Sequence, residues 1–269
     1  MQLVSAMQDR CFSLYHYQAL KDRGLGYLEQ TLRHRTIHMS RPSSFNDPWD
    51  CKPWFNSSIL DSADERELHL QWLVATQNVR PAEEAELRGK PVLLRALIEQ
   101  VRDGHVRGVD DRYRVYCMSP DATIQLMWAH YGDNHRGVAL EYDARADQVL
   151  WAYRVNYSQQ YPTQRLYDDE DNANLVPIFT KSDVWSYERE YRLLAEEMPG
   201  ERANMLRTVD STLTLARGAL IGVVLGCQCD EDPVIELLDR CARDLRVRRV
   251  RRVMDRYALT LETIREARP

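Results

Sequence analysis

Residues 219–226, ALIGVVLG, decide the fold class when they are read together with the residues that follow them. The stretch is an apolar run of strand length that ends in glycine, which is typical of a buried strand. Residues Asp232–Asp244 follow with a helical pattern, and the acids from Asp230 to Asp232 suit the positive end of a helix. Two further strand patterns, Val247–Val253 and Tyr257–Thr263, close the chain.

Upstream of this stretch, strands and helices do not alternate regularly. Short strands are predicted at Ser13–Tyr17, Thr36–Ser40, Tyr113–Met118, Arg136–Tyr142, Leu150–Tyr157 and Glu190–Ala195, and helices at Ala19–Arg33, Ala122–His130 and Val176–Ser182. Leu150–Tyr157 is expected to be the hairpin partner of the strand before it. The prediction is an α+β fold with mixed, mostly antiparallel sheets, in a single domain (residues 1–269) with a helical insertion at about 58–108.

Bulk composition restricts the class of protein. With 269 residues and 44% hydrophobic residues, the chain can bury a sizeable core, and a formal net charge of -5 gives no overall basic balance that would require nucleic acid. No signal peptide or membrane span is recognisable, so we expect a cytoplasmic protein with buried free thiols and no membrane contact. The basic run Arg246–Arg252 is interpreted as an edge strand with one charged face, and a nucleic-acid or partner contact stays open as the alternative.

The densest group of reactive side chains lies in residues 181–192, KSDVWSYEREYR. If this segment is extended, Glu188 and Glu190 share one face, and paired carboxylates can stabilise positive charge on a sugar. Trp185 and Tyr187 add surfaces on which a flat ring could stack. The competing interpretation is a solvated strand face on which Arg189 and Arg192 are cross-strand partners of the acids.

Three other segments combine polar and aromatic residues. His16 lies in the middle of the first strand, where it is either a structural residue or a contact to a ligand hydroxyl. Asn46 and Asp47 lie in a loop that is either a simple turn or part of a site. Trp128–Gly137 joins a helix to a strand and includes Tyr131, but its two histidines lack a third ligand at metal spacing, so no metal site is predicted.

Four fragments taken together resemble a known bacterial family, the domain of unknown function 2971. They are Leu14–Tyr17, Ser40–Pro48, Met127–Val138 and Trp185–Arg192, and Val224–Cys227 also fits. The resemblance extends from about Cys11 to Leu261. This family name implies no activity.

The order of the histidine strand and the Glu-x-Glu strand is also similar to ADP-ribosyltransferases. That resemblance implies NAD as substrate, with His16 contacting the nicotinamide ribose and Glu190 or Glu188 as the catalytic carboxylate. Arg41 would meet a phosphate. The stacking aromatic residue stays open between Tyr113, Tyr116 and Trp128. The residues expected to contact NAD are Tyr17, Arg41, Asn46, Asp47, Ser119, Trp128, Tyr131, Trp185 and Arg192.

The leading hypothesis is therefore an NAD-dependent ADP-ribosyltransferase-like enzyme. It would be a toxin or anti-phage defence effector that modifies nucleic acid or protein. One alternative is a non-catalytic binding or regulatory module with a partner protein from the same operon. Another is a metal-dependent nuclease that uses Asp47, Glu188 and Glu190.

Overall fold

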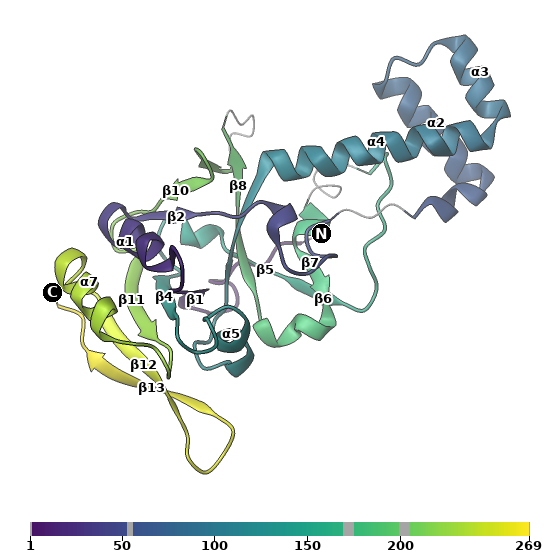
Figure 1. Cartoon of the computed structure of the whole chain (residues 1–269). Coiled ribbons are helices and arrows are strands. Elements are labelled where there is room, and N and C mark those ends of the chain that lie inside the picture. Colours follow the sequence, from purple (N-terminus) through teal and green to yellow (C-terminus); the bar gives the residue numbers. More distant parts are fainter. Residues whose placement is uncertain (1, 53–55, 169–174, 199–204, 269) are drawn as a thin grey trace. The chain divides into compact units, whose positions relative to one another are not determined.

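The computed structural model describes residues 2–52, 56–168, 175–198 and 205–268 (Figure 1). The chain forms two compact units. Unit 1 comprises Arg41–Tyr113 and Asn156–Asp183 together with Met1, and unit 2 comprises Gln2–Ser40, Arg114–Val155 and Val184–Pro269.

A five-stranded sheet forms the centre of unit 2, in the order β1-β4-β11-β12-β13. Its strands are β1 (Ser13–Gln18), β4 (Val138–Asp143), β11 (Leu220–Leu225), β12 (Arg246–Arg252) and β13 (Leu259–Arg265). All neighbouring pairs are antiparallel except β11 and β12, which are parallel. A parallel pair needs a crossover, and helix α7 (Asp232–Cys241) supplies it.

The second sheet of unit 2 has the order β3-β8-β5, and β9 pairs with β8. Its strands are β3 (Tyr113–Met118), β5 (Tyr153–Arg154), β8 (Tyr191–Glu197) and β9 (Leu206–Thr208). A two-stranded ladder joins β2 (Thr36–His38) to β10 (Thr212–Thr214). Single bridges from Tyr15 to Ser119 and from Ser40 to Val115 connect β3 to the neighbouring strands.

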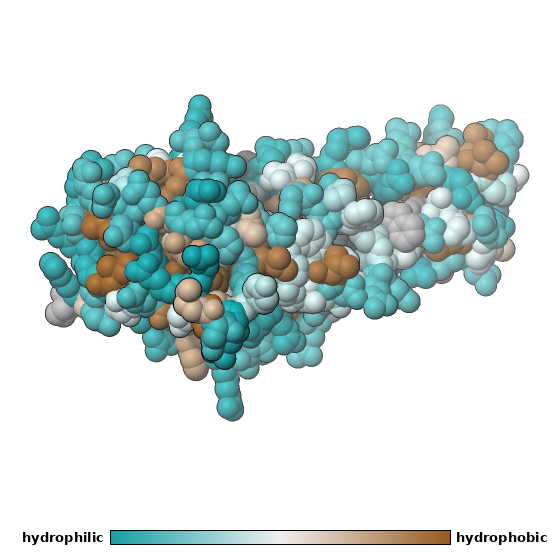
Figure 2. Space-filling view, turned by 60° about the horizontal axis from the view of Figure 1, so that its bottom comes forward, coloured by the Kyte–Doolittle hydropathy of each residue, from teal (hydrophilic) through white to brown (hydrophobic). Residues whose placement is uncertain are grey.

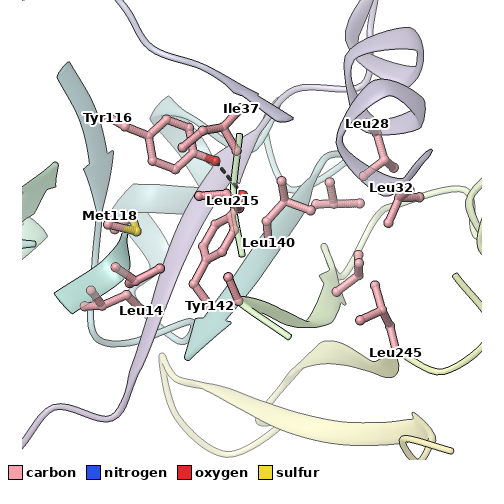
Figure 3. Close-up of a cluster of buried hydrophobic side chains, with 14 of the residues drawn as sticks. Leu14, Leu28, Leu32, Ile37, Tyr116, Met118, Leu140, Tyr142, Leu215 and Leu245 are labelled. Carbon is pink, nitrogen blue, oxygen red and sulfur yellow. Dashed lines mark hydrogen bonds between the residues drawn. The ribbon is translucent and has the colours of Figure 1, made fainter. Parts of the chain in front are cut away.

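Helices of unit 2 cover the hydrophobic core. They are α1 (Gly24–His34), α5 (Gln125–His130) and α7, with short 3-10 turns at Val149–Trp151 and Asp183–Glu188. Leu28 and Leu32, one turn apart on α1, point with Leu245 and Leu140 towards one buried cluster (Figure 3). In the same cluster the hydroxyl groups of Tyr116 and Tyr142 lie 2.8 Å apart, so these two buried polar atoms satisfy each other.

Unit 1 contains the predicted helical insertion. It has α2 (Ala63–Thr76), α3 (Pro81–Gly89), α4 (Pro91–Arg112), the 3-10 turns Pro42–Ser44 and Ser57–Asp61, helical residues 175–178, and a parallel pair of β6 (Asn156–Ser158) and β7 (Thr180–Ser182). Leu70, Leu73, Leu94 and Ile98 are buried together in its core. Ser62 begins α2 by accepting a hydrogen bond from the Glu65 backbone N–H.

No helix of the described residues is long and apolar enough to cross a membrane. The face in Figure 2 is mostly hydrophilic, and its hydrophobic residues are scattered. All six cysteines are free thiols.

The structure confirms the α+β class and the mixed, mostly antiparallel sheets, but it corrects two pairing predictions. Leu150–Tyr157 is not the hairpin partner of β4, because β5 pairs with β8 and β6 pairs with β7. The basic strand Arg246–Arg252 is not an edge, because β13 lies outside it. The short strands β9 and β10 were not predicted at all.

Buried charge explains why the basic strand lies inside the sheet. Glu141 on β4 is 1% exposed and accepts hydrogen bonds from Arg246 at 2.7 Å and from the Tyr15 hydroxyl at 3.1 Å. Arg248 lies 2.7 Å from its other oxygen. Gly222 of β11 lies between these strands, and a Cβ at this position would meet the Glu141 carboxylate at 2.7 Å.

Gly222→Ala is therefore expected to lower the free energy of unfolding by about 1–3 kcal/mol, because the added methyl group must displace a buried carboxylate. Urea unfolding followed by circular dichroism measures this difference.

Gly26→Ala serves as the matched control, since a Cβ there has no neighbour within 4 Å. It is expected to stabilise the chain by about 0.5–1 kcal/mol through helix propensity. Equal effects of the two substitutions would contradict the close approach at Gly222.

Candidate functional site

The hollow that contains His16 is formed within unit 2 and has a volume of about 560 Å³. We call it the histidine hollow. Its walls are formed by strands β1 and β2 and by helix α1. Strands β3 and β10 each add a single residue. Its lining is His16, Gln18, Tyr27, Gln30, Thr31, His34, Thr36, Ile37, His38, Ser40, Tyr116 and Thr212.

The lining of the histidine hollow is polar but carries no permanent charge. It consists mainly of hydroxyl groups, side-chain amides and imidazoles, and it includes no Asp, Glu, Lys or Arg. Such groups both donate and accept hydrogen bonds, which suits a ligand rich in hydroxyl groups. Tyr27 is 55% exposed on α1, so its ring is available at the hollow.

His16 is held in a defined tautomer. Its Nδ1 lies 2.8 Å from the carbonyl oxygen of Cys117, and its ring stacks on Tyr116 with 4.0 Å between centroids. Burial lowers the pKa of His16 to about 4, so the imidazole is neutral at pH 7. A carbonyl oxygen only accepts, so Nδ1 carries the proton and Nε2 is an acceptor for a ligand.

The two acids of the Glu-x-Glu segment are not a pair on one strand face, contrary to the prediction. Glu188 ends the 3-10 turn before β8, and Arg189 has a left-handed backbone with φ of 50°. Glu188 accepts a hydrogen bond from the Tyr131 hydroxyl at 2.8 Å. Both oxygens of Glu190 are held by Arg192, at 2.7 and 2.9 Å.

Burial also excludes the alternative of a solvated strand face. Glu188 and Glu190 are each 2% exposed and Arg192 is fully buried. Tyr191 and Leu193 point into the core cluster, so the alternating side chains of Glu190 and Arg192 point to the opposite face of β8. The histidine hollow includes His16 but neither acid in its lining.

Trp128 and Tyr17, both expected to contact NAD, are core residues in the structure. Trp128 is fully buried and donates its Nε1 hydrogen to the Ala122 carbonyl at 2.8 Å. Tyr17 packs edge-on against it at 5.0 Å and donates to the Asp121 carbonyl at 2.7 Å. Their rings stabilise the packing of α5 on β1 and offer no free face for stacking.

Tyr131 and Trp185 belong to a group of partly buried aromatic side chains next to Glu188. His130 contacts both of these rings and Tyr187, at 6.1 to 6.4 Å between centroids. Ser119, also predicted as a site residue, is buried and donates to the Glu188 carbonyl oxygen at 2.8 Å. Ser119 therefore fixes the backbone that carries the acid.

Arg41, Asn46 and Asp47 belong to unit 1. Arg41 lies 3.0 Å from Asp111 and 3.7 Å from Asp110, and Asn46 is exposed. Asp47 is buried and accepts from the Trp49 backbone N–H at 2.9 Å, which fits the turn interpretation, one of the two left open by the sequence.

Within the described ranges, no cluster of three or more His, Cys, Asp or Glu side chains could hold a metal ion. The carboxylates named for a metal-dependent nuclease have other contacts: Asp47 caps a turn, Glu188 accepts from Tyr131 and Glu190 binds Arg192.

Sequence reasoning missed the α1 and β2 side of the histidine hollow. Gln30, Thr31 and His34 lie on or just after a predicted helix, and His38 lies on a predicted strand, for which no site role was proposed. The available signal was His34 and His38, one at the end of α1 and one at the end of β2, four residues apart along the chain.

Comparison with known families supports the first resemblance. A family model described as "Protein of unknown function (DUF2971)" matches residues 127–193, which confirms the predicted similarity over the segment that contains Met127–Val138 and Trp185–Arg192. The matched segment holds Tyr131, Glu188, Glu190 and Arg192. No curated protein and no solved structure matches the chain.

His16 is expected to remain neutral, with the proton on Nδ1, from pH 5 to pH 8, because its pKa is lowered to about 4. NMR titration of ¹⁵N-labelled histidine measures both tautomer and midpoint.

The lowered pKa of His16 also makes the free energy of unfolding depend on pH. The unfolded chain takes up this proton near pH 6.5 and the folded chain near 4, so stability rises with pH across that window. His16→Phe, which keeps a ring on Tyr116, should lose this dependence. A titration midpoint of His16 near 6.5 would contradict the burial argument.

Arg192→Met is expected to lower the free energy of unfolding by about 3–5 kcal/mol, since it leaves the buried Glu190 carboxylate without its arginine. The double variant with Glu190→Met should recover much of that loss, and urea unfolding compares the two. If the single and double variants are equally unstable, the ion pair is not the cause.

Proposed function

We propose that unit 2 binds the nucleoside part of NAD in the histidine hollow and that the protein is an ADP-ribosyltransferase-like enzyme. The observation that carries this proposal is the fixed neutral imidazole of His16 in an uncharged, hydroxyl-lined hollow. The Nε2 atom of His16 can accept a hydrogen bond from a ribose hydroxyl group, and the hydroxyl and amide groups of the lining can both donate to and accept from the other ribose oxygens.

Size and shape support the same ligand class. Small-molecule sites typically have volumes of about 300–1,000 Å³, and the histidine hollow has about 560 Å³. Tyr27 provides a ring on which a flat base can stack. The lining has no Arg or Lys, so the phosphates would lie outside it.

The reaction that we propose breaks the bond between ribose C1′ and the nicotinamide nitrogen. Nicotinamide leaves as a neutral molecule with the bonding electron pair, and a nucleophile of the acceptor bonds to C1′ and loses a proton. The carboxylate that would oppose positive charge on the ribose stays open between Glu188 and Glu190, because neither lines the histidine hollow, Glu188 accepts from Tyr131 and both oxygens of Glu190 are held by Arg192. Nucleic acid or protein as acceptor, the cytoplasmic location and a toxin or defence role stay predictions.

A second candidate is a binding module without catalysis. The specific observation in its favour is that neither Glu188 nor Glu190 lines the histidine hollow. Under this alternative, NAD or a related nucleotide binds, but its glycosidic bond stays intact.

NAD binding is measured by isothermal titration calorimetry on the full chain. Gln30→Trp places a large ring in the hollow from an exposed helix position and should weaken binding at least about 10-fold, which corresponds to about 1.4 kcal/mol. Gln71→Trp, at an exposed helix position of unit 1, is the matched control and should bind as wild type does.

Turnover is measured separately, as nicotinamide released from NAD in the presence of cell extract. Glu188→Gln and Glu190→Gln are compared, and the variant that removes the catalytic carboxylate is expected to lower kcat by at least about 100-fold with little change in NAD affinity. Binding without any nicotinamide release would favour the non-catalytic module. Failure of wild type to bind NAD, or equal binding by Gln30→Trp, would overturn the proposal for this hollow.

A further inference from the structure

The hairpin of β12 and β13 ends in a tip with unusual exposure. Met254 is 91% exposed and Tyr257 is 101% exposed, whereas large apolar and aromatic side chains normally gain by burial. The tip is closed by a hydrogen bond from the Val253 backbone N–H to the Ala258 carbonyl at 3.0 Å. Figure 1 shows it running beyond the five-stranded sheet of unit 2.

Arg252 precedes these exposed side chains and Arg256 lies between them, next to the exposed acid Asp255, which also lines the hollow described below. Arg252 and Arg256 are exposed, and neither makes an ion pair with another residue that the structure describes. This contrasts with Arg251, which binds Glu262, and with Arg248, which binds Glu141. The unpaired guanidinium groups are therefore available to an anionic ligand.

The tip forms one wall of a second hollow in unit 2, of about 580 Å³, which we call the hairpin hollow. The opposite wall carries the side-chain amides of Gln125 and Gln228 and the imidazole of His135. The Nδ1 atom of His135 is buried without a hydrogen-bond partner among the described residues.

The loop that presents His135 has a left-handed backbone over three residues and is held by backbone hydrogen bonds. Asp133, Asn134 and His135 are consecutive residues with φ of 49°, 52° and 68°. The loop is held from both sides, since His135 N–H donates to the Trp128 carbonyl at 3.1 Å and the His135 carbonyl accepts from Gln228 N–H at 2.9 Å. Backbone strain of this kind persists where the surroundings enforce it, and it is concentrated at ligand-binding sites.

We propose that the hairpin hollow is a binding site for single-stranded nucleic acid. Arg252 and Arg256 take backbone phosphates, Tyr257 stacks on a base, and the amides of Gln125 and Gln228 contact base edges. A single strand fits because its bases are free to reach both the ring and the amides. The inference does not depend on NAD binding in the histidine hollow.

Fluorescence anisotropy of the full chain with labelled oligonucleotides of about 10 nucleotides tests this site, with separate RNA and DNA arms at about 50 mM salt. The double variant Arg252→Ala, Arg256→Ala is expected to bind about 10-fold or more weakly and to reduce the salt dependence by about two released counterions. Tyr257→Ala should weaken binding about 5- to 100-fold at every salt concentration.

The matched control is Arg217→Ala, Arg240→Ala, which removes the same charge from exposed positions of the same unit. It should keep wild-type affinity. An equal loss in the control would show unspecific charge attraction and overturn the proposal, as would failure of wild type to bind either RNA or DNA. Polyglutamate tests for an acidic protein partner. If polyglutamate competes with the oligonucleotide and its binding is unchanged by Tyr257→Ala, the ligand of this site is an acidic protein and not nucleic acid.

Discussion

The buried carboxylate of Glu141 joins three strands of the central sheet of unit 2. It accepts from Tyr15 on β1 and from Arg246 on β12, and it lies against Arg248, while β11 passes between with Gly222. Burying a charge is unfavourable unless opposite charges and hydrogen-bond donors surround it, so these residues must be placed together. The parallel pairing of β11 and β12 satisfies that condition.

The need to place arginines beside the buried Glu141 carboxylate also fixes the positions of α7 and β13. With β12 fixed beside β11, helix α7 must form the crossover between them, and β13 becomes the edge of the sheet. The alternating arginines of β12 then divide between its two faces. Arg246 and Arg248 turn towards Glu141, whereas Arg249 reaches Glu231 and Arg251 reaches Glu262. The end of β12 leaves Arg252 at the hairpin tip, so the core network determines which arginine is presented there.

Local patterns predicted the strands well and their partners poorly. Tyr113–Met118 was predicted with its observed bounds, because alternation and composition act within a few residues. The interior position of Arg246–Arg252 could not be predicted, because the carboxylate that accepts its arginines is more than a hundred residues away along the chain. The same limit applies to the site. A left-handed residue at Arg189 separates Glu188 from Glu190, and periodicity carries no information on a single backbone angle.

The location of the charges also changes what the net charge of -5 implies. Glu141 and Glu190 are each paired with arginines, so their negative charges are neutralised locally. The guanidinium groups of Arg252 and Arg256, by contrast, are exposed at one end of a hairpin. An acidic protein can therefore present exposed arginines locally, and the uncharged histidine hollow and the hairpin hollow, which is lined by Arg252, Asp255 and Arg256, can select ligands of different chemistry within one unit.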